Sequence, residues 1–229
     1  MSEIDSIEPQ PPYLFPPYKA TLKRAPTQPL IIVPARLCET SGPLFGHHSV
    51  TASDADLTSH GHAPPLGEQI IVSGIVRDED AKPIRGALIE IWQANAAGRY
   101  RHKADRHGAP LDPNFTGCGR DITDDHGRYR FTTIRPGAYP WANSDNAWRP
   151  AHIHFSLFGA GLISRLVTQM YFPGDPLLPF DPIFQSVPGE RARNRLVSCF
   201  DWDTTVAGHA LGFRFDIVLR GRTATPTER

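Results

Sequence analysis

The sequence predicts an all-β chain, an antiparallel β-sandwich with a long N-terminal arm, long loops and little helix. Three observations support this. Short segments of alternating apolar and polar residues recur after residue 67, and only residues 190–200 have a helical pattern. The 229 residues also include 23 prolines and 19 glycines, dispersed along the chain. Proline is excluded from helix interiors and central strands, so this composition indicates short strands joined by turns.

Six segments have the composition and alternation of strands. The first, residues 69–77, is rich in β-branched side chains, and in the third Tyr129 and Phe131 share one face. Turn-forming residues separate the strands at 78–83, 124–127 and Pro136-Gly137. The expected strands are residues 69–77, 86–93, 128–134, 152–158, 165–172 and 212–220.

The chain divides near residue 66. Residues 1–66 lack strand alternation, and residues 9–18 combine proline with Tyr13, Phe15 and Tyr18. Such a segment cannot build its own core, so we expect an extended arm that packs on the main domain or on a partner chain. Residues 67–229 are expected to form the sandwich.

Charge and composition exclude several functional classes. Lys plus Arg equals Asp plus Glu at 24 each, so a neutral chain has no global attraction for nucleic acid. No segment approaches the roughly 20 apolar residues that cross a membrane, and the acidic N-terminus lacks a signal-peptide core. The three cysteines, Cys38, Cys118 and Cys199, are too widely spaced for a metal or disulfide framework. A cytoplasmic location is expected.

Candidate ligands begin with His152 and His154, which share one face of an expected strand. This pair suits a metal, although satisfied core histidines remain an equal alternative. Tyr100 and Tyr139 lie at strand-to-loop junctions, where site residues often occur. Taken alone, they are more easily interpreted as packing residues. A second group, His47, His48, His60 and His62, lies in a polar segment, where a surface loop is favoured over a metal site.

Several motifs in consistent order give the chain a family resemblance. They are IVSG (71–74), LIEIWQAN (88–95), GRY (98–100), YPW (139–141), WRPAHIH (148–154) and QMYFPGDP (169–176). Over residues 18–222 the chain resembles the intradiol ring-cleavage dioxygenases, whose fold is a prealbumin-like sandwich. In combination these motifs are highly specific.

The resemblance implies a non-haem Fe(III) ion, one per chain, held by Tyr100, Tyr139, His152 and His154. Phenolate oxygen is a hard anionic donor that suits ferric iron, and imidazole also binds iron. A free tyrosine titrates near pH 10, so a strong local cation is needed to keep it ionised.

The resemblance also implies roles around the metal. Tyr139 would act as a base, Arg149 would stabilise developing negative charge, and Gln169 would orient a substrate or water. The implied substrate-binding residues are Tyr18, Trp141, Tyr171 and Ile183.

The implied reaction is cleavage of protocatechuate (3,4-dihydroxybenzoate) by O2 to 3-carboxy-cis,cis-muconate, in aromatic catabolism through the β-ketoadipate pathway. A proline-rich arm, rather than a helical one, favours the type in which this iron-bearing β chain pairs with a homologous α chain. Relatives often carry arginine at the position of Ala142, so hydroxyquinol or another substituted catechol is an alternative substrate.

Two alternative hypotheses assign the chain a different class of function. A prealbumin-like module could simply bind a ligand without catalysis, and zinc or copper on His152 and His154 could support hydrolysis. The pair Tyr100 and Tyr139 argues against both, because neither reading requires two tyrosines at the site.

Overall fold

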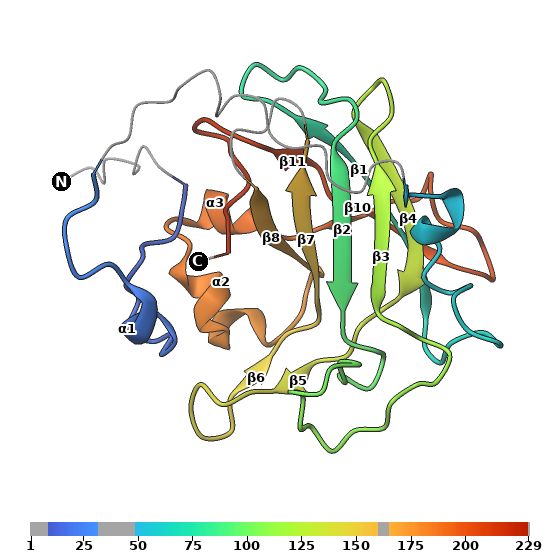
Figure 1. Cartoon of the computed structure of the whole chain (residues 1–229), viewed down its shortest axis with the longest axis horizontal. Helices are drawn as coiled ribbons and strands as arrows, with labels where there is room; N and C mark the ends of the chain where they lie inside the picture. Colours follow the sequence, from blue (N-terminus) through green and yellow to red (C-terminus); the bar gives the residue numbers. More distant parts are fainter. Residues whose placement is uncertain (1–8, 32–48, 160–164, 229) are drawn as a thin grey trace.

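The computed structural model describes residues 9–31, 49–159 and 165–228 (Figure 1). Two main sheets form a sandwich. The first contains β1 (Gln69–Arg77), β4 (Arg128–Ile134), β9 (Cys199–Phe200), β10 (Leu211–Arg214) and β11 (Ile217–Val218). The second has the order β3 (Cys118–Ile122), β2 (Leu88–Gln93), β7 (His152–Phe158) and β8 (Leu166–Tyr171), and all its pairings are antiparallel.

A third, two-stranded ribbon pairs β5 (Tyr139–Pro140) with β6 (Trp148–Arg149). It lies at the end of the second sheet where β7 begins (Figure 1). The helices are short and peripheral: α1 (Thr21–Arg24), α2 (Pro182–Ser186) and α3 (Glu190–Asn194), with 3₁₀ turns at Ala52–Ala55 and Leu178–Phe180. In the described part of the chain, no helix combines the length and apolar character needed to cross a membrane.

Aromatic side chains fill the space between the two main sheets. Phe155 of β7 lies 5.8 Å from Phe131 and 5.9 Å from Tyr129, both on β4 of the opposite sheet (ring centroids). Phe215 completes the group at 5.2 Å from Phe155. Burial of large apolar rings dominates core stability, so these contacts hold β7 firmly against the first sheet.

Most predicted strands are confirmed. Residues 69–77, 128–134 and 152–158 match β1, β4 and β7, while the expected 86–93 and 165–172 are trimmed to Leu88–Gln93 and Leu166–Tyr171. The short strands β3, β5, β6 and β9 were not predicted, because they are two to five residues long and lack clear alternation.

Two predicted elements need correction. The expected strand 212–220 is broken, because the Asp216 carboxylate, rather than a backbone carbonyl, accepts the Ile75 amide hydrogen bond at 3.0 Å. The resulting β10 and β11 both run parallel to β1. The expected helix 190–200 ends at Asn194, since the chain then pairs with the end of β8 through hydrogen bonds between Tyr171 and the backbone of Leu196 and Ser198.

The described part of the arm reaches the ribbon. The Lys19 amide donates to the Asn143 side chain at 2.9 Å, and the Asn143 side-chain amide donates to the Pro17 carbonyl at 2.9 Å. The ring of Tyr18 lies 5.6 Å from the Trp141 ring. The arm segment around residue 18 is therefore beside the loop that follows Tyr139.

Candidate active site

Strand β7 places the two histidines. It is buried on both faces, with Ile153, Phe155 and Leu157 directed into the sandwich core. Because strand side chains alternate, His152 and His154 share the opposite face. Their rings are 4.8 Å apart, and their Nε2 atoms are separated by 3.2 Å.

Hydrogen bonds set the tautomer of both rings. His152 Nδ1 lies 2.8 Å from the Pro150 carbonyl, and His154 Nδ1 lies 3.2 Å from the Glu228 carboxylate. A carbonyl or carboxylate oxygen can only accept, so each Nδ1 carries a hydrogen and Nε2 is the nitrogen left to bind a metal. Burial, followed by the charge of Arg149, lowers the pKa of His152 well below its usual value. Two Nε2 atoms facing each other at this distance fit a shared cation.

Two loops bring the tyrosines to the same place. Gly98 has a φ of 76°, and a Cβ there would collide with the Ala138 carbonyl oxygen. A Cβ on Gly137 would collide in turn with the Ala96 carbonyl, and the Gly137 amide donates to the Asn95 carbonyl at 2.9 Å. Only glycine permits this close backbone approach.

The tyrosine rings then meet the histidines. The rings of Tyr100 and Tyr139 are in T-shaped contact at 5.3 Å. The Tyr139 hydroxyl lies 3.4 Å from His152 Nε2, and the Tyr100 ring lies 6.3 Å from the His154 ring. The Tyr100 amide is fixed by the Asp105 carboxylate at 2.8 Å. All four predicted ligands are therefore brought together.

The donor set fits ferric iron. Burial raises the pKa of Tyr100 well above its usual value, with a further contribution from Tyr139, and burial also raises the pKa of Tyr139. Ionised phenols here would therefore require an adjacent cation. Across the described ranges, no three His, Cys, Asp or Glu side chains gather as a metal site. Two phenol oxygens and two imidazoles suit a hard trivalent ion better than zinc.

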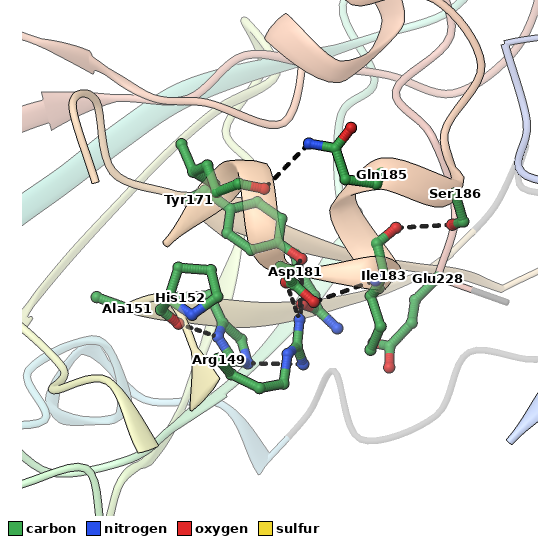
Figure 2. A network of polar contacts seen from close by, with 12 residues as sticks. Arg149, Ala151, His152, Tyr171, Asp181, Ile183, Gln185, Ser186 and Glu228 are labelled. Atoms are coloured by element: carbon green, nitrogen blue, oxygen red, sulfur yellow. Dashed lines mark hydrogen bonds and ion pairs between the residues drawn. The ribbon is translucent and has the colours of Figure 1, made fainter. Parts of the chain in front are cut away.

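Arg149 lies against this group in a buried polar network (Figure 2). It pairs across the ribbon with Tyr139, and its Nη1 lies 3.3 Å from His152 Nε2. Its Nη2 lies 2.6 Å from Gln169 Oε1, 2.9 Å from the Tyr171 hydroxyl and 2.9 Å from Asp181 Oδ2. Gln169 is thus in contact with Arg149.

Asp181 is a site residue that sequence reasoning missed. Its side chain is fully buried and also accepts the Ile183 amide at 3.1 Å as the N-cap of α2. The Asp-Pro pair at 181–182 is a helix-start signal, but no local pattern indicates its pairing with Arg149. Burial opposes the charge of Arg149, yet Tyr171 and Asp181 outweigh it and raise the pKa of Arg149.

A groove of about 1460 Å³ opens onto the tyrosines and His154. Trp141 and Ala142 line it, and Trp92 stacks on the His154 ring at 4.7 Å. Cations also line it: Arg101, Arg106, Arg120 and Arg165.

Six predicted site residues do not line this groove: Tyr18, Arg149, His152, Gln169, Tyr171 and Ile183. Gln169, Tyr171 and Ile183 instead line a small cavity of about 10 Å³ together with Glu228. Tyr18 lies beside Trp141, with the Arg24 guanidinium 4.8 Å from its ring centre.

Among the described residues, the remaining candidates form no second metal centre. His60 lies at the groove, where its Nε2 is 3.0 Å from the Ser53 carbonyl, and His62 is exposed. His47, His48 and Cys38 lie outside the described residues. Cys118 and Cys199 are free thiols.

Unpartnered polar atoms concentrate at the site. Six buried side-chain nitrogen or oxygen atoms in the described part of the chain lack a hydrogen-bond partner. Four of them belong to Tyr100, Trp141, Arg149 and Gln169. Buried polar groups are normally satisfied, so this clustering indicates a place built to receive a ligand.

Two family models and a curated relative match this chain. A family model described as Dioxygenase matches residues 40–221, and one described as Protocatechuate 3,4-dioxygenase beta subunit N terminal matches residues 5–36. The protocatechuate 3,4-dioxygenase beta chain of Burkholderia cepacia is 61% identical over 221 residues, covering 96% of this chain and 94% of that one.

Solved structures share the fold. The dioxygenase domain of a dioxygenase carbohydrate-binding protein fusion from Streptomyces sp. SirexAA-E aligns with a TM-score of 0.53 at 27% identity, covering 80% of this chain and 98% of that one. The 3-chlorocatechol 1,2-dioxygenase of Rhodococcus opacus 1CP aligns with a TM-score of 0.57 at 23% identity, covering 74% of this chain and 65% of that one. The second likeness concerns the fold alone.

Proposed function

Since the chain belongs to the intradiol ring-cleavage dioxygenases, we propose that it is the iron-bearing chain of an enzyme that cleaves protocatechuate with O2 to 3-carboxy-cis,cis-muconate. The observation that carries this proposal is the convergence of the buried Tyr100 hydroxyl and the half-buried Tyr139 with two imidazole Nε2 atoms that lie 3.2 Å apart. A simple binding module would have no use for this donor set.

The family uses non-haem iron, and the four converging residues would hold one Fe(III) here: Tyr100, Tyr139, His152 and His154. The bound ion would act as a Lewis acid that binds both catechol oxygens and prepares the ring for attack by O2. Zinc or copper chemistry would leave the two phenols without a role.

The chain's own residues would then manage charge and protons. As a phenolate, Tyr139 would accept the proton of a catechol hydroxyl and become a neutral phenol; its oxygen lies 3.4 Å from His152 Nε2. Arg149 supplies a fixed cation beside His152, where negative charge would develop on the substrate. Gln169 contributes by fixing the Arg149 guanidinium at 2.6 Å.

Protocatechuate is the favoured substrate for two reasons. One is the high identity to the Burkholderia cepacia beta chain. The other is the presence of Arg101 and Arg106 in the groove, which suits a ring that carries a carboxylate; Arg120 and Arg165 already pair with Asp54 and Glu90. Ala142 also lines the groove and offers no charge, so hydroxyquinol or another substituted catechol remains the second candidate.

The size of the groove supports a partner chain. Small-molecule pockets usually enclose about 300–1,000 Å³, whereas this groove measures about 1460 Å³ and would hold a single aromatic ring loosely. We propose that a homologous α chain covers part of it and completes the substrate pocket.

Colour provides the direct test. The iron-loaded chain, in complex with its α partner, should be burgundy because of charge transfer from tyrosinate to Fe(III). Tyr100→Phe should weaken or shift this band, whereas Tyr13→Phe on the exposed part of the arm should leave it unchanged. Protocatechuate should perturb the band more than catechol or hydroxyquinol. A colourless protein that contains a full complement of iron would refute the proposal.

A further inference from the structure

We propose that Glu228 is a positioning residue for His154, held in place by a strap formed by residues 224–228. This inference rests on the proposed function, because it concerns one of the proposed iron ligands. It assigns a role to a segment that lies beyond the last family motif in the sequence.

The strap is anchored along its length. The Thr225 amide donates to the Val218 carbonyl at 2.8 Å, and the Thr225 hydroxyl accepts from the Val218 amide at 2.9 Å. Farther along, the Glu228 amide donates to the Val167 carbonyl at 2.7 Å, and the Thr168 hydroxyl donates to the Pro226 carbonyl at 2.7 Å. The strap therefore connects β11 of the first sheet to β8 of the second.

These anchors aim the Glu228 side chain at the back of His154. Its Oε2 lies 3.2 Å from His154 Nδ1, on the opposite side of the ring from the Nε2 atom that faces His152. The Trp92 ring stacks on the same imidazole with an interplanar angle of 6°. Trp92 therefore fixes the plane of the ring, and Glu228 selects one of the two flipped χ2 orientations that share this plane and fixes the tautomer.

The two histidines are held by different means. His152 donates to the carbonyl of Pro150, only two residues away in its own chain segment. His154 instead depends on a side chain 74 residues away in sequence. The χ2 angle of histidine is broad and roughly two-fold, so a ring without this acceptor could flip and place Cε1, a carbon, where Nε2 faces the metal.

The strap also contacts the N-terminal arm. The Thr227 amide donates to the Gln10 side chain at 2.7 Å. The arm, the strap and His154 thus form a continuous chain of hydrogen bonds, so the position of Glu228 depends on correct docking of both terminal segments.

The test measures iron binding by the full chain with its α partner. Glu228→Ala should weaken Fe(III) affinity by about 10–100-fold, the usual effect of losing a carboxylate behind a metal-bound histidine. Affinity is read by competition with a chelator, and the tyrosinate-to-iron band is recorded in parallel. Glu228→Gln keeps an acceptor oxygen and should restore most of the affinity. Glu228→Asp keeps the charge but shortens the reach, and should restore little.

The matched control is Glu79→Ala, which removes an ion pair with Arg220 at 2.8 Å on the exposed surface near the start of the strap. It should leave affinity and colour unchanged. Equal iron affinity in the wild type and in Glu228→Ala would overturn the inference while leaving the proposed function intact. A wild-type complex that binds no iron would overturn both. If the alanine variant fails to fold, the contrast between the glutamine and aspartate variants decides, and equal affinity in these two would overturn the inference.

Discussion

Arg149 is buried beside the Trp141 ring, and Asp181, fully buried 2.9 Å away, compensates its charge. The pair is expensive to place in the interior, and attraction between the partners offsets that cost only while both are present. The gain is positional: a cation held by Asp181, Gln169 and Tyr171 stays beside His152 without being neutralised.

The Asp181→Asn variant tests this arrangement. Asparagine retains an oxygen that can accept the Ile183 amide, so the cap of α2 survives while the charge is lost. We expect the free energy of unfolding to fall by about 3–5 kcal/mol, as for other buried ion pairs deprived of one partner. Urea unfolding of the chain measures the change.

The control is Asp125→Asn, which breaks the exposed pair with Arg85 at 3.3 Å. Exposed pairs contribute about 0–1 kcal/mol, so this variant should remain close to the wild type. A similar loss of unfolding free energy in both variants would show that the buried Arg149–Asp181 pair contributes no more to stability than an exposed pair.

Individual site residues differ in how far the sequence could predict them. His152 and His154 could be placed on one strand face by period-two alternation alone. Tyr100 and Tyr139 could be identified only through family resemblance, because no local pattern reports that two loops meet in space. No local pattern indicated the site contacts of Asp181 and Glu228, since both act through residues more than 30 positions away.

At the scale of elements, the site depends on the loops after β2 and β4. Gly98 and Gly137 allow these loops to lie in direct backbone contact, and this contact sets the separation of the Tyr100 and Tyr139 rings. The geometry of the proposed iron site is therefore determined by glycine backbone as much as by ligand side chains.

Replacing Gly98 with alanine tests this dependence. The new Cβ would strike the Ala138 carbonyl, so the loops must separate and carry Tyr100 away from Tyr139. We expect a weaker tyrosinate-to-iron band and lower iron content, measured by absorption and metal analysis.

Gly86→Ala provides the matched control. Gly86 has a similar φ of 68°, but an added Cβ would meet nothing within 4 Å. It should cost about 1–2 kcal/mol of stability for the left-handed backbone and leave the colour intact. Identical spectra for both variants would argue against a positioning role for the Gly98 contact.

The elements that the sequence predicted well are those with long, regular alternation and burial in the core. Residues 128–134 and 152–158 are examples. The errors at 190–200 and 212–220 arise from tertiary hydrogen bonds, to Tyr171 in one case and to Asp216 in the other. No local pattern contains that information, nor the parallel pairing of β10 with β1.

At the scale of the whole molecule, the open groove predicts that activity depends on the proposed α chain. We expect the iron-loaded chain alone to bind iron and show colour, because all four proposed ligands belong to it. Its kcat/KM for protocatechuate should be much lower than that of the complex, because the groove leaves the substrate poorly enclosed. Steady-state O2 uptake with and without the α chain measures the difference. Full turnover by the isolated chain would contradict the prediction.

Strand β7 is buried on both faces, with the core on one side and the proposed ligands on the other. A pairing error of one residue against β2 or β8 would exchange these faces. Ile153 and Phe155 would then face the tyrosines, and two imidazoles would enter the hydrocarbon interior. Chains in which β7 pairs in the wrong register can therefore neither pack their core nor bind iron. The fraction of coloured protein in a refolding experiment would count the chains whose strands have aligned in register.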